Sequence, residues 1–82
     1  MLLSAEISMY PLADDYIGPI REIIKKLNTY RGLEVSTYPT ATVLVGEHEV
    51  VMDALKDALG WSHERFGTSV FVTKLITGYE AQ

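Results

Sequence analysis

The sequence opens with a strand pattern followed directly by a helix pattern, and this pair limits most strongly what the chain can fold into. Apolar and polar side chains alternate from Leu3 onward, which is typical of a strand that is buried on one face only. The apolar set is Ala5, Ile7 and Met9, and the outward set is Glu6, Ser8 and Tyr10. Pro11 ends the pairing because proline has no backbone donor.

The next segment has the spacing of an amphipathic helix. Asp14 or Asp15 offers an N-cap, and Pro19 is tolerable in the first turn. Gly32 is a natural C-terminal stop. Apolar side chains recur every three or four residues and predict an inward stripe of Ile17, Ile20, Ile24, Leu27 and Tyr30.

The second half of the chain repeats this plan. Residues 33–38 and 41–45 predict a hairpin with its turn at Pro39 and Thr40. Residues 68–77 are nearly all apolar or β-branched, which predicts a last strand that is well covered. Between them, residues 47–66 predict a helix closed by Gly67, with Gly60 marking a bend or a close contact. Residues 78–82 are expected to be a frayed tail or an arm used in assembly. The inward side of this helix is predicted to be Val51, Ala54, Leu55, Ala58, Leu59 and Ser62.

The order β-α-β-β-α-β predicts an α+β, ferredoxin-like domain spanning residues 1–82. Its four-stranded antiparallel sheet carries both helices on one face. The other face is then open, and parity adds residues of the hairpin to it: Ser36, Tyr38, Thr42 and Leu44. A face that mixes tyrosine and leucine with a carboxylate and hydroxyls should be covered by another subunit, a ligand, or both.

Composition excludes several classes of function. With 11 acidic and 7 basic residues the net charge is −4, which argues against nucleic acid as a partner. The absence of cysteine excludes disulfides, thiolate zinc sites and thiol catalysis. No apolar run has the length of a membrane span and no secretory signal pattern opens the sequence, so we expect no membrane partner and a cytoplasmic compartment.

Catalytic and metal-binding motifs are also missing. His48 and His63 are fifteen positions apart and have no partner at helical spacing, so we interpret both as surface histidines and expect no metal site. Asp14 and Asp15 are interpreted as a helix cap, not as a paired acid and base. We therefore expect neither enzyme activity nor a cofactor.

The candidate ligand-binding residues lie on the predicted open face. The carboxylate of Glu6 can accept two hydrogen bonds from an aminopyrimidine-like edge, although a solvated residue or an intersubunit salt bridge is an equal alternative. Ser8 and Thr42 would supply further donors and acceptors. Tyr10 and Tyr38 could stack on a heteroaromatic ring, or on each other in an oligomer interface.

Three segments resemble the YkoF-like thiamine-binding family. They are the opening AEISMYPLADDYIGPIREIIKKLN, the T-x-x-x-G-E of Thr42 to Glu47 with the following VVMDAL, and the closing SVFVTKLITG. The resemblance implies a non-enzymatic domain that binds thiamine or its hydroxymethylpyrimidine moiety in thiamine uptake or salvage. The namesake type carries two such domains, so this chain is expected to form a homodimer or homotetramer through the sheet face.

Two other classes of function stay open at this stage. One is a structural or regulatory interaction module, whose open sheet face serves oligomerisation or docking to a partner protein. The other is a small dimeric enzyme of similar fold, such as a cofactorless oxygenase, but neither histidine falls on a predicted strand.

Overall fold

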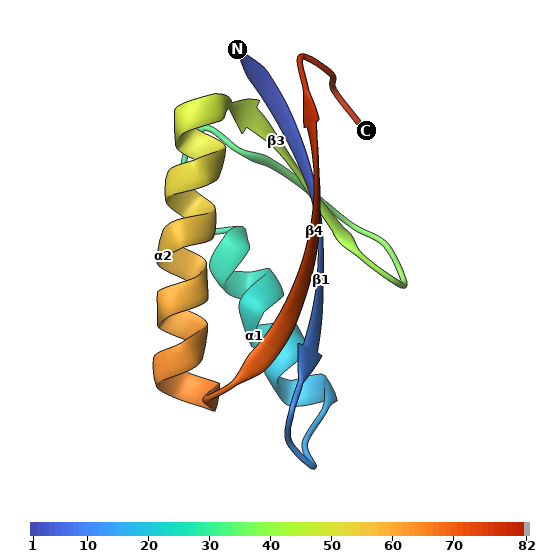
Figure 1. Ribbon diagram of the computed structural model, residues 1–82, viewed down its shortest axis with the longest axis vertical. Helices are drawn as coiled ribbons and strands as arrows, with labels where there is room; N and C mark the ends of the chain where they lie inside the picture. Colours follow the sequence, from blue (N-terminus) through green and yellow to red (C-terminus); the bar gives the residue numbers. More distant parts are fainter. Residues whose placement is uncertain (82) are drawn as a thin grey trace.

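The chain forms a four-stranded antiparallel sheet with two helices packed on one of its faces (Figure 1). The computed structural model describes residues 1–81. The strand order across the sheet is β2-β3-β1-β4, which confirms the predicted α+β arrangement. The elements are β1 (Leu2–Pro11), α1 (Ile17–Leu27), β2 (Glu34–Thr37), β3 (Thr42–Glu47), α2 (His48–Phe66) and β4 (Ser69–Thr77).

The hydrophobic core lies between the helices and the sheet. The alternation in β1 is confirmed, because Ala5, Ile7 and Met9 belong to the core whereas Tyr10 is exposed. Burial of this apolar stripe is the main favourable term in folding so short a chain. The core consists of Leu3, Ala5, Ile7, Met9, Ile23, Leu27, Leu44, Val51, Leu55 and Ala58.

Helix α1 begins later than the aspartates suggested. Its N-cap position is Tyr16, but the Asp15 carboxylate accepts a hydrogen bond from the Gly18 backbone N–H at 3.1 Å and satisfies one free donor of the first turn. The inward stripe was wrong at Ile17, the first residue of the helix, which is 59% exposed. The first buried residue of the helix is Pro19. Ile23, which the predicted stripe omitted, is buried.

Helix α2 matches its predicted range and ends at Gly67, whose φ of +73° suits glycine. Leu59 was wrongly assigned to the inward side and is 41% exposed. At about 100° per residue it lies roughly 80° around the helix from the buried Val51, at the flank of the stripe. A Cβ at Gly60 would meet no atom of the described residues within 4 Å, so the predicted close contact is absent.

The predicted parity of the hairpin was wrong at Thr42 and Leu44. Thr42 lies opposite Ile7 and Leu44 opposite Ala5, so both face the helices. The loop between β2 and β3 sets a register in which Ser36 lies opposite Val43. An even-numbered residue of β2 therefore faces the same side as an odd-numbered residue of β3. Parity cannot be carried across such a loop, so only Ser36 of the predicted set shares the open face with Glu6.

The segment after β4 folds back onto the open face. The Gly78 backbone N–H donates to the Leu2 carbonyl at 2.7 Å. The Ser4 hydroxyl donates to the Tyr79 carbonyl and accepts from the Ala81 N–H. Residues 78–81 are therefore held on the sheet and are not frayed, whereas residue 82 of the predicted tail lies outside the described residues.

Candidate ligand-binding site

A small pocket lies between α1 and the sheet, where the β2–β3 loop meets β1. Its volume is about 70 Å³, and its walls are mostly aliphatic. Three residues carrying hydroxyl groups interrupt this apolar lining, which is the usual composition of a small-molecule site. The lining residues are Ile7, Ser8, Met9, Ile20, Ile23, Ile24, Leu27, Pro39, Thr40, Ala41, Thr42 and Phe71.

Two of the sequence-predicted site residues, Ser8 and Thr42, meet at this pocket. Thr42 is the first residue of β3 and only 5% exposed, and it faces α1 because it lies opposite Ile7. The Ser8 hydroxyl donates to the Thr40 carbonyl at 2.9 Å and ties β1 to the loop that closes the pocket. The pocket thus combines a buried threonine with a polar contact at its rim.

Glu6 lies on the opposite face of the sheet. It pairs with Val43 on one side and with Lys74 on the other, and its side chain is partly buried. No carboxylate oxygen of Glu6 comes within 4 Å of a cationic nitrogen in residues 1–81. Its carboxylate is therefore free to interact with other groups at that face, but it does not reach the pocket beside Thr42.

The two predicted stacking residues are apart from each other and from the pocket lining. Tyr10 is exposed near the end of β1, opposite Val70. Tyr38 is exposed in the β2–β3 loop, where its backbone N–H donates to the Ala41 carbonyl at 2.8 Å. Tyr38 directly precedes Pro39 of the pocket wall in the sequence, but it does not itself line the pocket.

Sequence reasoning missed the wall contributed by the helix and by β4. Ile20 and Ile24 were assigned to the core stripe, and Phe71 only to a last strand that was expected to be well covered. That expected cover was wrong, because β4 is an edge strand and most of its side chains are exposed. All three are partly buried and pack against the core while also bordering the pocket. Their periodicity is that of ordinary core residues, so no local signal distinguished them.

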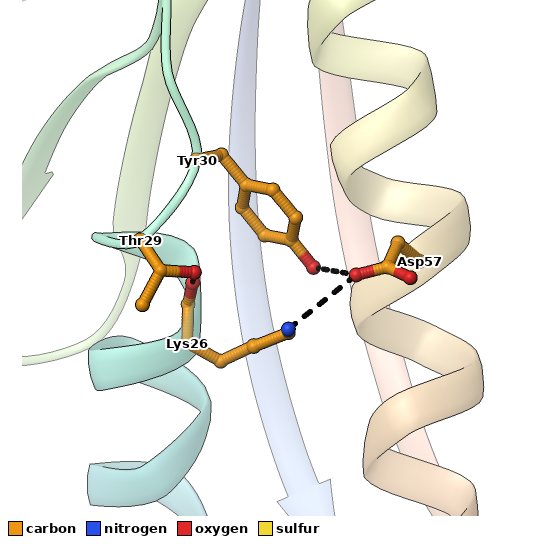
Figure 2. A network of polar contacts seen from close by, with 4 residues as sticks. All are labelled: Lys26, Thr29, Tyr30 and Asp57. Atoms are coloured by element: carbon orange, nitrogen blue, oxygen red, sulfur yellow. Dashed lines mark hydrogen bonds and ion pairs between the residues drawn. The ribbon is translucent and has the colours of Figure 1, made fainter.

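A second polar cluster joins the end of α1 to α2 (Figure 2). The Tyr30 hydroxyl donates to Asp57 Oδ2 at 2.5 Å, and Lys26 Nζ lies 3.6 Å from the same oxygen. Burial raises the pKa of Tyr30, and the neighbouring Asp57 carboxylate raises it further. The Tyr30 hydrogen bond and, to a smaller extent, Lys26 lower the pKa of Asp57 despite partial desolvation. The cluster therefore links the end of α1 to α2 through polar side-chain contacts.

Trp61 adds further contacts next to this polar cluster on α2. Its ring packs edge-on against Phe66 with centroids 5.9 Å apart, and Arg65 lies 4.9 Å from its centroid. Lys26 Nζ lies 5.7 Å from the same centroid. Such cation–π contacts support the packing of the helix surface.

Residues 1–81 hold neither a metal-binding cluster nor a membrane-spanning helix. No three side chains of histidine, aspartate or glutamate gather there in a way that could hold a metal ion. Neither helix in this part of the chain is long and apolar enough to cross a membrane.

A four-stranded antiparallel sheet with two helices on one face and a small pocket beneath α1 defines a ferredoxin-like α+β domain. The profile of the YKOF-related family matches residues 3–71, and the chain belongs to this family. The predicted family relationship is thereby confirmed.

Solved structures of similar proteins share the fold. A Streptococcus pneumoniae protein is 28% identical with a TM-score of 0.87, the match covering 96% of this chain and 89% of that one. A candidate thiamine biosynthesis or salvage protein of Thermotoga maritima is 22% identical with a TM-score of 0.84, covering 99% and 86%. A hypothetical protein of Methanocaldococcus jannaschii is 23% identical with a TM-score of 0.80, covering 99% and 84%. No curated protein matches the chain.

Proposed function

We propose that the chain binds thiamine or its hydroxymethylpyrimidine moiety, without catalysing a reaction, in the pocket beside Thr42. The observation that carries the proposal is the meeting of Ser8 and Thr42 at one mostly aliphatic pocket. Membership of the YKOF-related family supports a thiamine-type ligand, as does the description of the Thermotoga maritima protein as a candidate for thiamine biosynthesis or salvage.

The chemistry of the pocket suits a flat heteroaromatic ring with one polar edge. Aliphatic walls from α1 and the ring of Phe71 would contact its faces and methyl group, while the Thr42 hydroxyl would exchange hydrogen bonds with a ring nitrogen or amino group. A buried hydroxyl is selective, because a ligand that leaves it unpaired loses affinity.

Entry of such a ligand requires the pocket to widen. Its 70 Å³ is well below the ~300 Å³ at the lower end of ligand sites. The wall formed by Pro39, Thr40 and Ala41 belongs to a loop, and loops move more readily than the elements they join. The Ser8–Thr40 hydrogen bond is the contact that this movement would break or preserve.

Isothermal titration with thiamine, and separately with hydroxymethylpyrimidine, tests this proposal. We expect saturable binding of a single ligand per chain, and Thr42→Val should weaken it about fivefold because a net hydrogen bond is worth ~1 kcal/mol. Glu6→Gln is the matched control on the open face and should bind as the wild type does. If Glu6→Gln but not Thr42→Val weakened ligand binding, the site would lie on the open face and not in the pocket. No binding heat, together with an unchanged melting temperature, would overturn the proposed function.

A second candidate function is an interaction module that assembles through the open sheet face. Half-exposed Val70, Val72 and Ile76 favour it, because large apolar side chains gathered on one face commonly mark an interface. A homodimer or homotetramer in light scattering, combined with no ligand binding in the titration, would support this function over the first.

A further inference from the structure

The pocket beside Thr42 lies where the pairing between β1 and β3 stops. Ile7 and Thr42 are the last residues of β1 and the first of β3 that pair with each other. Beyond Ile7, β1 borders the β2–β3 loop on this side, whereas its pairing with β4 continues to Pro11 on the other side. The loop side of the pocket therefore lacks the ladder of hydrogen bonds that holds a strand to its neighbour.

The other walls of the pocket are fixed more firmly. Lys26 Nζ lies 3.6 Å from Asp57 Oδ2 and links α1 to α2. Several lining residues from α1 and β1 also belong to the buried core: Ile7, Met9, Ile23 and Leu27. Moving α1 or β1 outward would open voids in this core, and close-packed interiors tolerate such voids poorly. Widening of the pocket for a ligand therefore falls on the β2–β3 loop, residues 38–41.

Two hydrogen bonds define the position of this loop. The Tyr38 backbone N–H donates to the Ala41 carbonyl at 2.8 Å, and because both residues belong to the loop this bond can move with it. The Ser8 hydroxyl donates to the Thr40 carbonyl at 2.9 Å and joins the loop to β1. This second bond is exposed, so water can satisfy both of its groups when it breaks. Ser8 is thus a reversible link between β1 and the movable wall of the pocket.

We propose that Ser8 is a positioning residue that holds the pocket closed in the ligand-free chain, and that its hydrogen bond to Thr40 breaks when a ligand enters. Like the proposed function on which it rests, this role concerns the pocket beside Thr42. The free volume of about 70 Å³ and the ~300 Å³ at the lower end of ligand sites require two positions of the loop. A bond made only in the closed position lowers the fraction of chains that can bind, and with it the apparent affinity. Ser8 therefore opposes ligand binding, whereas Thr42 favours it.

Isothermal titration of Ser8→Ala with hydroxymethylpyrimidine tests the sign of this effect. We expect binding about two- to fivefold tighter than in the wild type, because the loss of one exposed hydrogen bond raises the open fraction by this factor. A serine that contacted the ligand would give the opposite change. Ser8→Thr keeps the hydroxyl and should restore the wild-type affinity. Ser36→Ala, at a serine of β2 that does not line the pocket, is the matched control and should bind as the wild type does. Weaker or unchanged binding by Ser8→Ala would overturn the proposal.

The rates of binding give a second test, measured by surface plasmon resonance on the immobilised chain. The Ser8–Thr40 bond belongs to the closed, ligand-free form, so its removal should speed association and leave the dissociation rate of the ligand nearly unchanged. Thr42→Val removes a hydroxyl that is proposed to contact the ligand and should instead speed dissociation. A gain in affinity of Ser8→Ala that came only from slower dissociation would place the effect in the bound form and overturn the proposal.

A third test needs no ligand and so separates this proposal from the proposed function. NMR relaxation dispersion at the Ala41 amide measures the open population of the free chain. We expect this population to rise about two- to fivefold in Ser8→Ala and to stay at the wild-type level in Ser8→Thr and Ser36→Ala. Exchange that is absent or equal in the wild type and Ser8→Ala would overturn the role of Ser8 even if the ligand binds. The expected rise, together with no ligand binding in the titration, would overturn the proposed function and support the closing role of Ser8.

Discussion

The two faces of the sheet use neighbouring residues for different purposes. Along β1, Ala5 and Ile7 are buried under the helices, while the residues between and beside them, Glu6 and Ser8, point to the other face. The helix face is apolar and closely packed. The open face carries the polar side chains of β1, and it is mostly apolar along β3 and β4. Substitutions should therefore act on stability at the first face and on binding or assembly at the second.

The largest expected effect comes from the same truncation made on each face. Leu44 is fully buried on the helix face, so Leu44→Ala should reduce the free energy of unfolding by about 2–5 kcal/mol. Leu2 lies on the open face and is partly exposed, so Leu2→Ala should cost less than about 1 kcal/mol. Urea denaturation measures both, and equal losses would show that the two faces are packed alike.

Glycine substitutions give an intermediate effect. A Cβ at Gly46 on the helix face would lie 2.6 Å from the Gly32 carbonyl oxygen and 2.9 Å from Leu33 Cδ2. Gly46→Ala should therefore destabilise the fold by about 1–3 kcal/mol.

The matched control is Gly60→Ala on the exposed side of α2, where an added Cβ meets no atom of residues 1–81 within 4 Å. It should stabilise the helix by roughly 0.5–1 kcal/mol. Thermal melts of both variants test the pair. A tolerated Gly46→Ala would mean that the segment just before β2 moves away from β3 easily.

The smallest effect is expected in the polar cluster that joins the end of α1 to α2. Tyr30→Phe removes the hydrogen bond to Asp57 and should lower Tm by a few degrees at pH 7. Because the pKa of Asp57 is lowered from 3.8 in the folded chain, its contribution is present above that value and is lost as the pH falls through the lower, folded pKa.

The Tm difference between wild type and Tyr30→Phe should accordingly disappear in strong acid. A pH series of melts measures this difference, and Lys26→Met serves as a control that keeps the hydrogen bond but removes the cation. A difference that stays constant down to low pH would show that packing of the ring, not the hydrogen bond, accounts for the loss.

Much of the fold could be predicted from local patterns. The alternation in β1 and the stripe of α2 are repeated several times within one element, and the one wrong inward position of α2, Leu59, lies at the flank of its stripe. In α1 the predicted stripe included the exposed Ile17 and omitted the buried Ile23. The candidate site was harder to predict from the sequence. Ser8 and Thr42 were both singled out, but they were placed on the open face with Glu6, whereas Thr42 faces α1. Their roles in ligand binding stay predictions.

The amino-acid sequence by itself determined the order of elements, the covered face of β1 and the family, because these depend on short-range periodicity and on residue identity. Only the tertiary structure decided the side of the sheet on which Thr42 lies, the meeting of α1, the β2–β3 loop and Phe71 around one pocket, and the exposure of β4. The reason is physical: alternation sets faces within one strand, but the register between strands is set by loop geometry and by packing between segments far apart in the chain.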